Sequence, residues 1–432
     1  MTILGIDIGS SSVKAGVLRG RRVLGRLARV RFDTHYDGER AEVDADEVLR
    51  AVGQATRQLD LRRVECVALS TMSPSWLAMD RRGHAITPVV THQDRRSVAI
   101  ARKIELRVGK ARHLRLAGNR PFPGGISSTT CAWFLRHQRA LMRRADLVGH
   151  LGTYVHRRVT GSRVTDPSHA SFMGLYRTPD LGGWSDELCD AVGISTHALP
   201  QILGSEEIGG LVTRGGARLL GVRHGTPMLA GMTDTGAAML LAGARPGQLV
   251  NISGSTDVLA LCLDSPVPNE RLLTRALGVG RLWLSVSTLA AAGSALDWVK
   301  DNLFADVGWT QFKRLISRAA RQKGAGLVVF DPCLGGDRTG IEQPTAALRG
   351  LSLSTTRHHM LAAICDALAR ASAERIGLLR SVNHVKIDPR VVISGGAAEI
   401  VRDVLHRDWR GRWTFRFEDE ATLRGLALLV PG

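Results

Sequence analysis

The feature that most constrains how this chain can fold is an apolar strand that runs into a turn of glycine and serine, at residues 4–18. In order, the stretch reads Leu4-Gly5-Ile6-Asp7-Ile8-Gly9-Ser10-Ser11-Ser12-Val13-Lys14-Ala15-Gly16-Val17-Leu18. Ile6 and Ile8 alternate with Asp7 as the side chains of a strand do. The small residues of the turn cannot fill a core, but they let backbone N–H groups approach an anion closely. On this stretch alone, a phosphate-binding hairpin and an ordinary polar turn are equally open.

The same pattern returns in the other half of the chain. There the sequence reads Val250-Asn251-Ile252-Ser253-Gly254-Ser255-Thr256-Asp257-Val258-Leu259-Ala260. Two strand–turn–strand hairpins in the two halves of one chain indicate a duplicated fold. In the first hairpin, the carboxylate of Asp7 can hold a hydrated Mg²⁺, and Lys14 adds a positive charge near the turn.

The composition is that of a soluble globular protein, with 44% hydrophobic and 23% charged residues. The length of 432 residues exceeds one ordinary core, so two domains of roughly 200 residues are expected. No apolar run reaches about 18 residues, so we expect no membrane span. The first residues do not show a basic segment followed by an apolar one, so we expect no secretory signal. The scattered cysteines form no CxxC pair, which argues against a zinc ribbon or a disulfide framework and favours a cytoplasmic location.

The formal net charge of +18 raises the question of nucleic-acid binding. The basic residues are nearly all arginines spread along the chain, with only small clusters such as residues 19–22, and there is no zinc finger, RNP motif or basic tail. We therefore do not expect nucleic acid as a partner. A positive site that attracts ATP and an anionic product explains the charge more simply.

The two hairpins resemble those with which actin-like ATPases grip phosphates, and in detail those of the FGGY carbohydrate kinases, most closely the xylulokinase-like members. The opening motif of that family, Gly-Ile-Asp-Leu-Gly-Thr-Ser-x-Val-Lys, matches residues 5–14 with conservative changes. The resemblance covers residues 4–430. It implies an α/β fold of two actin-like (ribonuclease H-like) lobes with a ligand cleft between them. The expected lobes are residues 1–243, for the sugar and the catalytic base, and residues 244–432, for ATP.

The resemblance implies where the nucleotide and its metal would bind. Asp7 would position Mg²⁺. The implied ATP-binding residues are Gly9, Ser10, Ser11, Ser12 and Lys14 in the first hairpin, Gly254, Ser255 and Thr256 in the second, and Gly395, Gly396 and Ala397. The last three follow a predicted strand, and missing Cβ atoms there would let a flat adenine lie against the backbone.

Asp234 falls on the family's general base. It lies in a run that resembles the family pattern Gly-x-Pro-Val-x-Ala-Gly-x-x-Asp-x-x-Ala and begins at Gly225. Thr235 replaces the asparagine that the family has after this aspartate. The alternative is that Asp234 is no more than the N-cap of a helix.

The sugar site departs from the family pattern. Where xylulokinases carry Gln-Met-His-Gly, the histidine falls on Pro74 and the glycine on Ser75, so the segment matches in place but not in content. Asp94 inherits a carboxylate that accepts hydrogen bonds from sugar hydroxyls, with Arg96 orienting it; a helix cap is the alternative. The implied substrate-binding residues are Ser73, Pro74, Ser75, Asp94 and Asp234.

The implied activity is phosphorylation of a sugar hydroxyl by Mg-ATP, on a pentulose or xylulose-like substrate, with Asp234 as general base. The alternatives are a kinase for another polyol or sugar acid, a catalytically silent sugar- or nucleotide-binding regulator, and a chaperone-like ATPase. The presence of both Asp7 and Asp234 argues against silence, and the lack of a peptide-binding domain argues against a chaperone. The expected partners are a small-molecule sugar and ATP, without a membrane; a homodimer and the identity of the sugar are left open.

Local patterns predict several elements around these motifs. Asp44 or Asp46 is expected to cap the first helix. Helices are predicted at residues 44–59, 147–159, 356–379 and 421–429, and strands at residues 64–69, 391–394 and 413–417.

Overall fold

The computed structural model describes residues 1–321, 327–396 and 403–430, and the chain forms two compact units. The first unit contains residues 1–245, 262–284 and 420–432, and the second contains residues 246–261 and 285–419. The first boundary lies close to the one expected after residue 243. Two segments expected in the second lobe belong to the first unit, where strand β17 (Leu273–Ala276) and helix α15 (Ala421–Leu426) bury apolar side chains.

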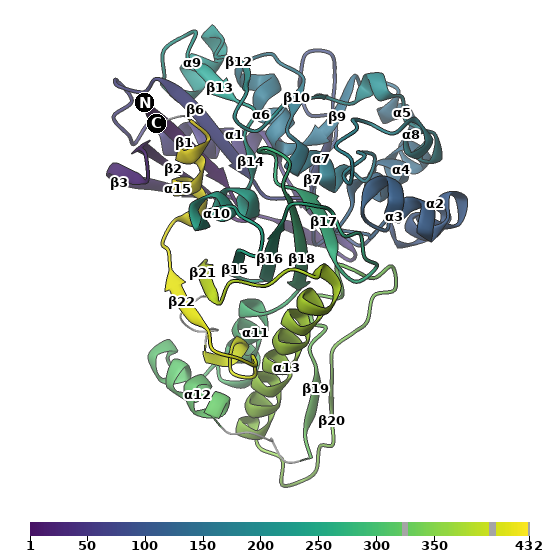
Figure 1. Cartoon of the computed structure of the whole chain (residues 1–432), viewed down its shortest axis with the longest axis vertical. Coiled ribbons are helices and arrows are strands. Elements are labelled where there is room, and N and C mark those ends of the chain that lie inside the picture. The colour runs from purple at the N-terminus through teal and green to yellow at the C-terminus, as the bar shows by residue number, and fades with distance from the viewer. Residues whose placement is uncertain (322–326, 397–402, 431–432) are drawn as a thin grey trace. The chain divides into compact units, whose positions relative to one another are not determined.

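A seven-stranded sheet forms the centre of the first unit (Figure 1). Its strands follow the order β12-β13-β6-β1-β2-β3, with β14 paired to β6 beside this path. Their bounds are Thr2–Ile8 (β1), Ser12–Arg19 (β2), Arg22–Arg31 (β3), Cys66–Thr71 (β6), Ile208–Leu211 (β12), Pro227–Leu229 (β13) and Met232–Thr233 (β14). Strands β1, β13 and β14 run parallel to β6, so their carboxyl ends share one edge, where α/β sheets bind ligands.

Helices cover both faces of this sheet. On one face, an apolar core joins the strands to α1 (Ala45–Thr56), α6 (Leu151–Val159) and α9 (Arg214–Leu220). On the other face, α10 (Asp234–Ala242) packs against α15, which also contacts β1 and β6 (Figure 1). Helix α1 begins as predicted, because Asp44 is its N-cap and accepts a 2.7 Å hydrogen bond from the N–H of Glu47.

A five-stranded sheet, ordered β4-β5-β8-β7-β9, also belongs to the first unit. Its strands are His35–Asp37 (β4), Arg40–Val43 (β5), Ser75–Met79 (β7), Val89–Thr91 (β8) and Leu147–His150 (β9). The predicted helix 147–159 is wrong over its first four residues, which form β9 and pair antiparallel with β7. All four are buried, as in a strand covered on both faces, and α6 starts only at Leu151.

Short helices and a small strand pair complete the first unit. They are α2 (Val98–Val108), α3 (Lys110–Ala117), α4 (Ser127–His137), α5 (Arg139–Met142), α7 (Pro167–Met173), α8 (Asp186–Val192), the 3-10 turn η1 (Thr196–Ala198), β10 (Val164–Thr165) and β11 (Gln201–Ile202). Within the described part of the chain, no helix has both the length and the apolar character needed to cross a membrane.

Most strands of the second unit lie in a six-stranded sheet, ordered β17-β18-β16-β15-β21-β22. They are β15 (Leu249–Ser253), β16 (Asp257–Leu263), β18 (Trp283–Leu289), β21 (Arg390–Ser394) and β22 (Thr414–Phe417), and β19 (Val329–Asp331) pairs separately with β20 (Ala347–Arg349). An apolar core joins α11 (Gly293–Leu303), α12 (Trp309–Arg321) and α13 (Arg357–Asn383).

The patterns in the last third of the chain are confirmed. The helix predicted at 356–379 is α13, which begins after its N-cap Thr356. The strands predicted at 391–394 and 413–417 are β21 and β22. The helix predicted at 421–429 is α15, continued by a 3-10 turn over Ala427–Leu429.

Candidate active site

Two carboxylates lie at the ligand-binding edge of the seven-stranded sheet. Asp7 on β1 pairs with Ser70 on β6, and Ser70 pairs in turn with Met232 on β14. Asp234 directly follows β14 as the first residue of α10. Strands β1 and β14 both pair parallel with β6, and this shared partner brings together the two residues to which the resemblance gave the metal and the proton.

Asp7 is a carboxylate whose surroundings suit a cation. Its Oδ1 atom is buried and has no hydrogen-bond partner among the described residues. Burial and the charges of Asp234 and Glu420 raise the pKa of Asp7 and Lys14 lowers it, with a net result of about 7. An orphaned carboxylate oxygen beside other carboxylates fits hydrated Mg²⁺, which binds through one or two carboxylates and substrate phosphates. Within residues 1–321, 327–396 and 403–430, no group of three or more His, Cys, Asp or Glu side chains is arranged to hold a metal.

Asp234 is not the cap of its helix. The N-cap of α10 is Thr233, whose side chain accepts from the N–H of Gly236 at 3.3 Å. The Oδ1 atom of Asp234 instead accepts from the N–H and the hydroxyl of Thr235, at 2.6 and 3.1 Å. Because Thr233 does the capping, the alternative role considered for Asp234 is excluded, and its partly buried carboxylate has no structural task of that kind.

A buried polar chain holds the turn before Asp234. The backbone N–H of Thr233 donates to Ser168 Oγ at 3.0 Å, and Ser168 Oγ donates to the carboxylate of Asp166 at 2.5 Å. Asp166 also accepts from Nδ1 of His169, and Nε2 of His169 lies 2.8 Å from Thr71 Oγ1. Although burial lowers the pKa of His169, the Asp166 carboxylate outweighs it and holds the pKa above its usual value. These bonds tie the segment at residues 166–169 to the ends of β6 and β14.

The turn of the first hairpin is closed by a 3.0 Å hydrogen bond from the N–H of Gly9 to the carbonyl of Ser12. Ser10 and Ser11 are exposed at its tip. Their carbonyls accept from Thr34 Oγ1 and from the N–H of Phe32, each at 3.2 Å. Because these bonds use the carbonyls, they leave the N–H groups of the tip for an anion.

Lys14 is bound by a residue that the sequence did not single out. It stands directly opposite Asp7 in the β1–β2 pair, yet its Nζ donates to Oε2 of Glu420 at 2.7 Å. The two residues are 406 positions apart in the chain, and both belong to the first unit. No local pattern signals this pair, because Glu420 reads only as a charged residue before the last helix.

The second hairpin belongs to the second unit, and its turn is hydrogen-bonded to the N-terminus of α11. Its turn closes with a 2.8 Å bond from the N–H of Gly254 to the carbonyl of Thr256. The N–H groups of Ala292, the N-cap of α11, and of Ser294 in its first turn donate to the carbonyl of Ser255 at 3.0 and 3.1 Å. Ser255 is exposed. The carbonyls are again occupied, as in the first hairpin.

A buried ion pair fixes the second hairpin to α13. Asp257 is fully buried, and its Oδ2 accepts from Arg375 Nη2 at 2.5 Å. Its Oδ1 accepts from Asn251 Nδ2 at 2.7 Å and from the hydroxyl of Ser253. No local sequence pattern signals this pair, because a single aspartate after a polar turn does not indicate its partner.

The turn after β21 approaches the second hairpin closely. Gly395 has φ +114°, and a Cβ there would lie 2.1 Å from the carbonyl oxygen of Ser253. Only glycine fits at this position. Gly396 is exposed, and Ala397 lies outside the described residues. The nucleoside-binding role of this turn stays a prediction.

The residues predicted for the sugar are largely committed to protein contacts. Asp94 is 1% exposed; Arg96 reaches it with Nη2 at 2.6 Å and Nε at 3.0 Å, and the N–H of Ala41 donates to it at 2.9 Å. Ser75 is buried, donates to the carbonyl of Met72 at 2.8 Å and accepts from the N–H of Leu151. Pro74 is buried and Ser73 partly so. Arg96 thus contacts Asp94 as expected, while contact of these residues with a sugar stays a prediction.

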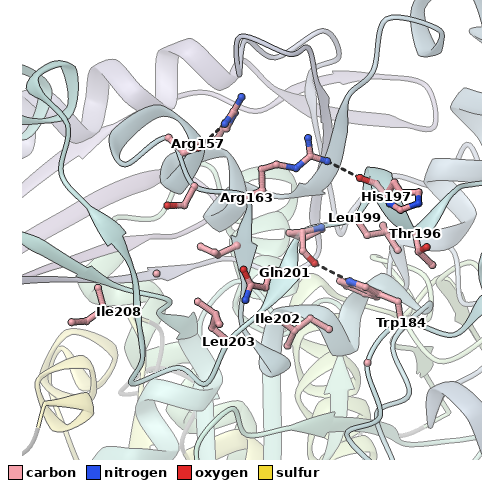
Figure 2. A pocket seen from close by; sticks show the side chains of 16 residues that line it. Arg157, Arg163, Trp184, Thr196, His197, Leu199, Gln201, Ile202, Leu203 and Ile208 are labelled. Atoms are coloured by element: carbon pink, nitrogen blue, oxygen red, sulfur yellow. Dashed lines mark hydrogen bonds between the residues drawn. The ribbon is translucent and has the colours of Figure 1, made fainter.

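A cavity of about 1060 Å³ in the first unit contains none of the predicted site residues (Figure 2). Arg157, Arg163, Trp184 and Gln201 are among the side chains that line it. Arg163 donates to the carbonyl of His197 at 2.7 Å, and Trp184 Nε1 to the carbonyl of Pro200 at 2.8 Å. The polar groups of Arg163 and Trp184 are therefore already engaged.

Comparison with known proteins decides the family. Residues 2–241 match the N-terminal domain of the FGGY family of carbohydrate kinases, and residues 249–401 match its C-terminal domain. This chain belongs to the FGGY family of carbohydrate kinases. It is a sugar kinase, an enzyme of a family that uses ATP as a substrate, and its α/β fold in two actin-like lobes is confirmed.

The similar proteins carry several sugar specificities. The chain is 23% identical to a xylulose kinase of Staphylococcus xylosus, over 99% of this chain and 90% of that protein. It is also 23% identical to a gluconokinase of Bacillus subtilis, over 84% of this chain and 74% of the relative. The crystal structure of a xylulose kinase from Rhodospirillum rubrum superposes with a TM-score of 0.86 at 22% identity, over 99% of this chain and 89% of that chain.

Proposed function

We propose that this FGGY kinase transfers the γ-phosphate of ATP to a hydroxyl group of a pentulose or xylulose-like sugar. The observation that carries the proposal is the pair of carboxylates, Asp7 and Asp234, at the ends of two strands that both run parallel to β6. A sugar hydroxyl is a poor nucleophile while it keeps its proton, and a carboxylate can accept that proton as the new P–O bond forms. Asp234 is free of capping duty and stands in the first turn of α10, where the helix dipole stabilises negative charge.

The chain's own groups would bind and orient the nucleotide. Bound Mg²⁺ neutralises charge on the phosphates during transfer, and Asp7 has the orphaned oxygen that would hold it. We assign phosphate binding to the tip of residues 9–12 with Lys14 in the first unit and to the tip of residues 254–256 in the second. Residues 395–397 are assigned to the nucleoside. Phosphoryl transfer needs positioning and charge neutralisation more than covalent help, and the assigned groups are of the types that provide both.

The substrate assignment rests on the segment around Pro74. Proline has no side-chain donor, so it cannot replace the hydrogen-bonding histidine found there in xylulokinases. The contacts that bury Ser75 and Asp94 also leave these side chains few free acceptor positions. We therefore propose that D-xylulose is at best one of several sugars that the enzyme accepts.

The test is a screen of Mg-ATP-dependent phosphorylation over ketoses, polyols and sugar acids, with ADP release coupled to NADH oxidation. We expect turnover of a pentulose and of at least one further sugar at comparable kcat/KM. Turnover of D-xylulose alone would contradict the interpretation of the pocket. Tight ATP binding without turnover of any member of the panel would favour the silent regulator instead.

A further inference from the structure

The arrangement of Lys14 raises a question that the proposed function leaves open. Residues directly opposite each other in an antiparallel pair project from the same face of the sheet, with Cβ atoms only about 5 Å apart. Lys14 and Asp7 are such a pair. The nearest carboxylate along the sheet for the Lys14 ammonium is therefore the one assigned to Mg²⁺, and a direct ion pair would occupy it.

The structure shows a different partner. Lys14 Nζ lies 2.7 Å from Glu420 Oε2, with the two side chains 30% and 27% exposed. The Oδ1 atom of Asp7 has no hydrogen-bond partner in the described part of the chain. Glu420 thus draws the ammonium away from the carboxylate that stands opposite it.

Glu420 adopts a backbone conformation that a non-glycine residue takes only under constraint. Its φ is +50°, in the left-handed region, and it directly precedes α15. A residue held in this region is strained unless the surrounding structure fixes it, and such residues gather at functional sites. A glycine at this position would avoid the strain. The presence of a glutamate is therefore explained by what its side chain does.

Helix α15 holds Glu420 rigidly with respect to the base. A Cβ on Gly425 would lie 1.8 Å from the carbonyl oxygen of Ala237, so the backbones of α15 and α10 touch. Leu423 of α15 also lies next to Gly5 of β1, where an added Cβ would meet its Cδ2 at 3.4 Å. The glutamate is therefore fixed to the strand that carries Asp7 and to the helix that carries Asp234 (Figure 1).

We propose that Glu420 is a positioning residue that holds Lys14 away from Asp7 and so keeps the Asp7 carboxylate available to the Mg²⁺ of Mg-ATP. This inference rests on the proposed function, because it takes Asp7 as the metal-positioning residue. Without Glu420, the Lys14 ammonium would turn to the carboxylate opposite it and compete with the cation there.

The test measures how much Mg²⁺ improves nucleotide binding, without using activity. Calorimetry gives the dissociation constant of ATP with EDTA and with Mg²⁺, and the ratio of the two reports the contact between metal and protein. Any direct contribution of Lys14 to phosphate binding cancels in this ratio. Glu420→Gln keeps the shape of the side chain, and we expect it to lower the ratio about tenfold, within the usual range of couplings between ligands.

A double-mutant cycle separates release of Lys14 from a simple loss of negative charge. If Glu420 acts by holding Lys14, Lys14→Met alone changes the ratio less than about threefold, and Lys14→Met/Glu420→Gln behaves like Lys14→Met. If the two charges act independently, the single changes have opposite effects that add, which would overturn the proposal. Glu105→Gln is the matched control, because Glu105 forms a similarly exposed pair with Arg120, and it should leave the ratio unchanged.

Asp7→Asn tells a failure of this inference from a failure of the proposed function. If Asp7→Asn does not lower the ratio, Asp7 is not the metal contact and the function assigned to it fails. If Asp7→Asn lowers the ratio but Glu420→Gln does not, the function stands and the role of Glu420 is refuted. Melting temperatures of all variants confirm that each is folded under the conditions of the titration.

Discussion

Replacing Gly425 by alanine should damage both stability and catalysis, through the contact between α15 and α10. The added Cβ would lie 1.8 Å from the carbonyl oxygen of Ala237 and 2.5 Å from its carbon, whereas contacts under 3.0 Å essentially never occur. The obstacle is backbone and cannot rotate away, so α15 must move by roughly 1 Å or more in a close-packed interior. Such overpacking costs about 1–3 kcal/mol, and the helix propensity gained with alanine offsets only about 1 kcal/mol.

The effect on the reaction should exceed the effect on stability. Helix α10 starts at Asp234 and α15 follows Glu420, so a shift between them misplaces two assigned residues. A displacement of about 1 Å can lower kcat roughly 100-fold. Urea unfolding and steady-state kinetics on the best sugar from the screen measure the two effects.

Gly377→Ala is the matched control. Gly377 lies inside α13, it is exposed, and an added Cβ would meet no atom within 4 Å. This change should raise the free energy of unfolding by about 0.5–1 kcal/mol and leave kcat unaltered. A Gly425→Ala variant as stable and as active as Gly377→Ala would refute the contact and the role given to α15.

Two further predictions follow from the structure. Gly254→Val should weaken ATP binding while sugar binding persists. The sequence left open that a forbidden φ would contribute, but Gly254 has no positive φ, and an added Cβ would meet only the carbonyl oxygen of Thr256, at 4.0 Å. The variant should therefore fold, and unchanged ATP affinity in calorimetry would remove this hairpin from the phosphate site. Burial lowers the pKa of His156 to about 4. Between pH 6.5 and 4 the unfolded chain therefore binds more protons than the folded chain. As the pH is lowered through this range, the free energy of unfolding decreases by about 3 kcal/mol because of this residue. His156→Gln should flatten that part of the profile in urea unfolding, and an unchanged slope would contradict the assignment.

The sequence predicted best what short-range chemistry determines. The hairpin at residues 4–18 and the cap at Asp44 follow from alternation, small turn residues and a side chain that reaches the N–H of Glu47 three residues on. The position of Asp234 at a strand-to-helix junction was also readable, because strand and helix patterns meet there. The sequence could not tell whether Thr233 or Asp234 is the N-cap of this helix, because both are small polar residues; in the structure Thr233 is the cap.

What the sequence could not predict depends on partners far along the chain. Residues 147–150 fit the helical spacing of apolar residues over 147–159, but in the structure they pair with the edge of β7 as a strand. The contact of Arg96 with Asp94 was expected, but the bond to Asp94 from the backbone N–H of Ala41, 53 positions away, had no signal in the sequence. The pair of Lys14 and Glu420 joins residues 406 positions apart, and only the packing of α15 against β1 brings them together.

The most direct test of the proposed mechanism is the kcat of Asp234→Asn on the best sugar. Asparagine keeps the shape of the side chain but cannot accept a proton, so we predict a loss of roughly 10²–10⁴-fold in kcat, with ATP affinity and melting temperature nearly unchanged. Asp60→Asn, at an exposed residue paired with Arg62, is the control and should keep full activity. Near wild-type kcat in a folded Asp234→Asn variant would show that Asp234 is not the base and would contradict the account.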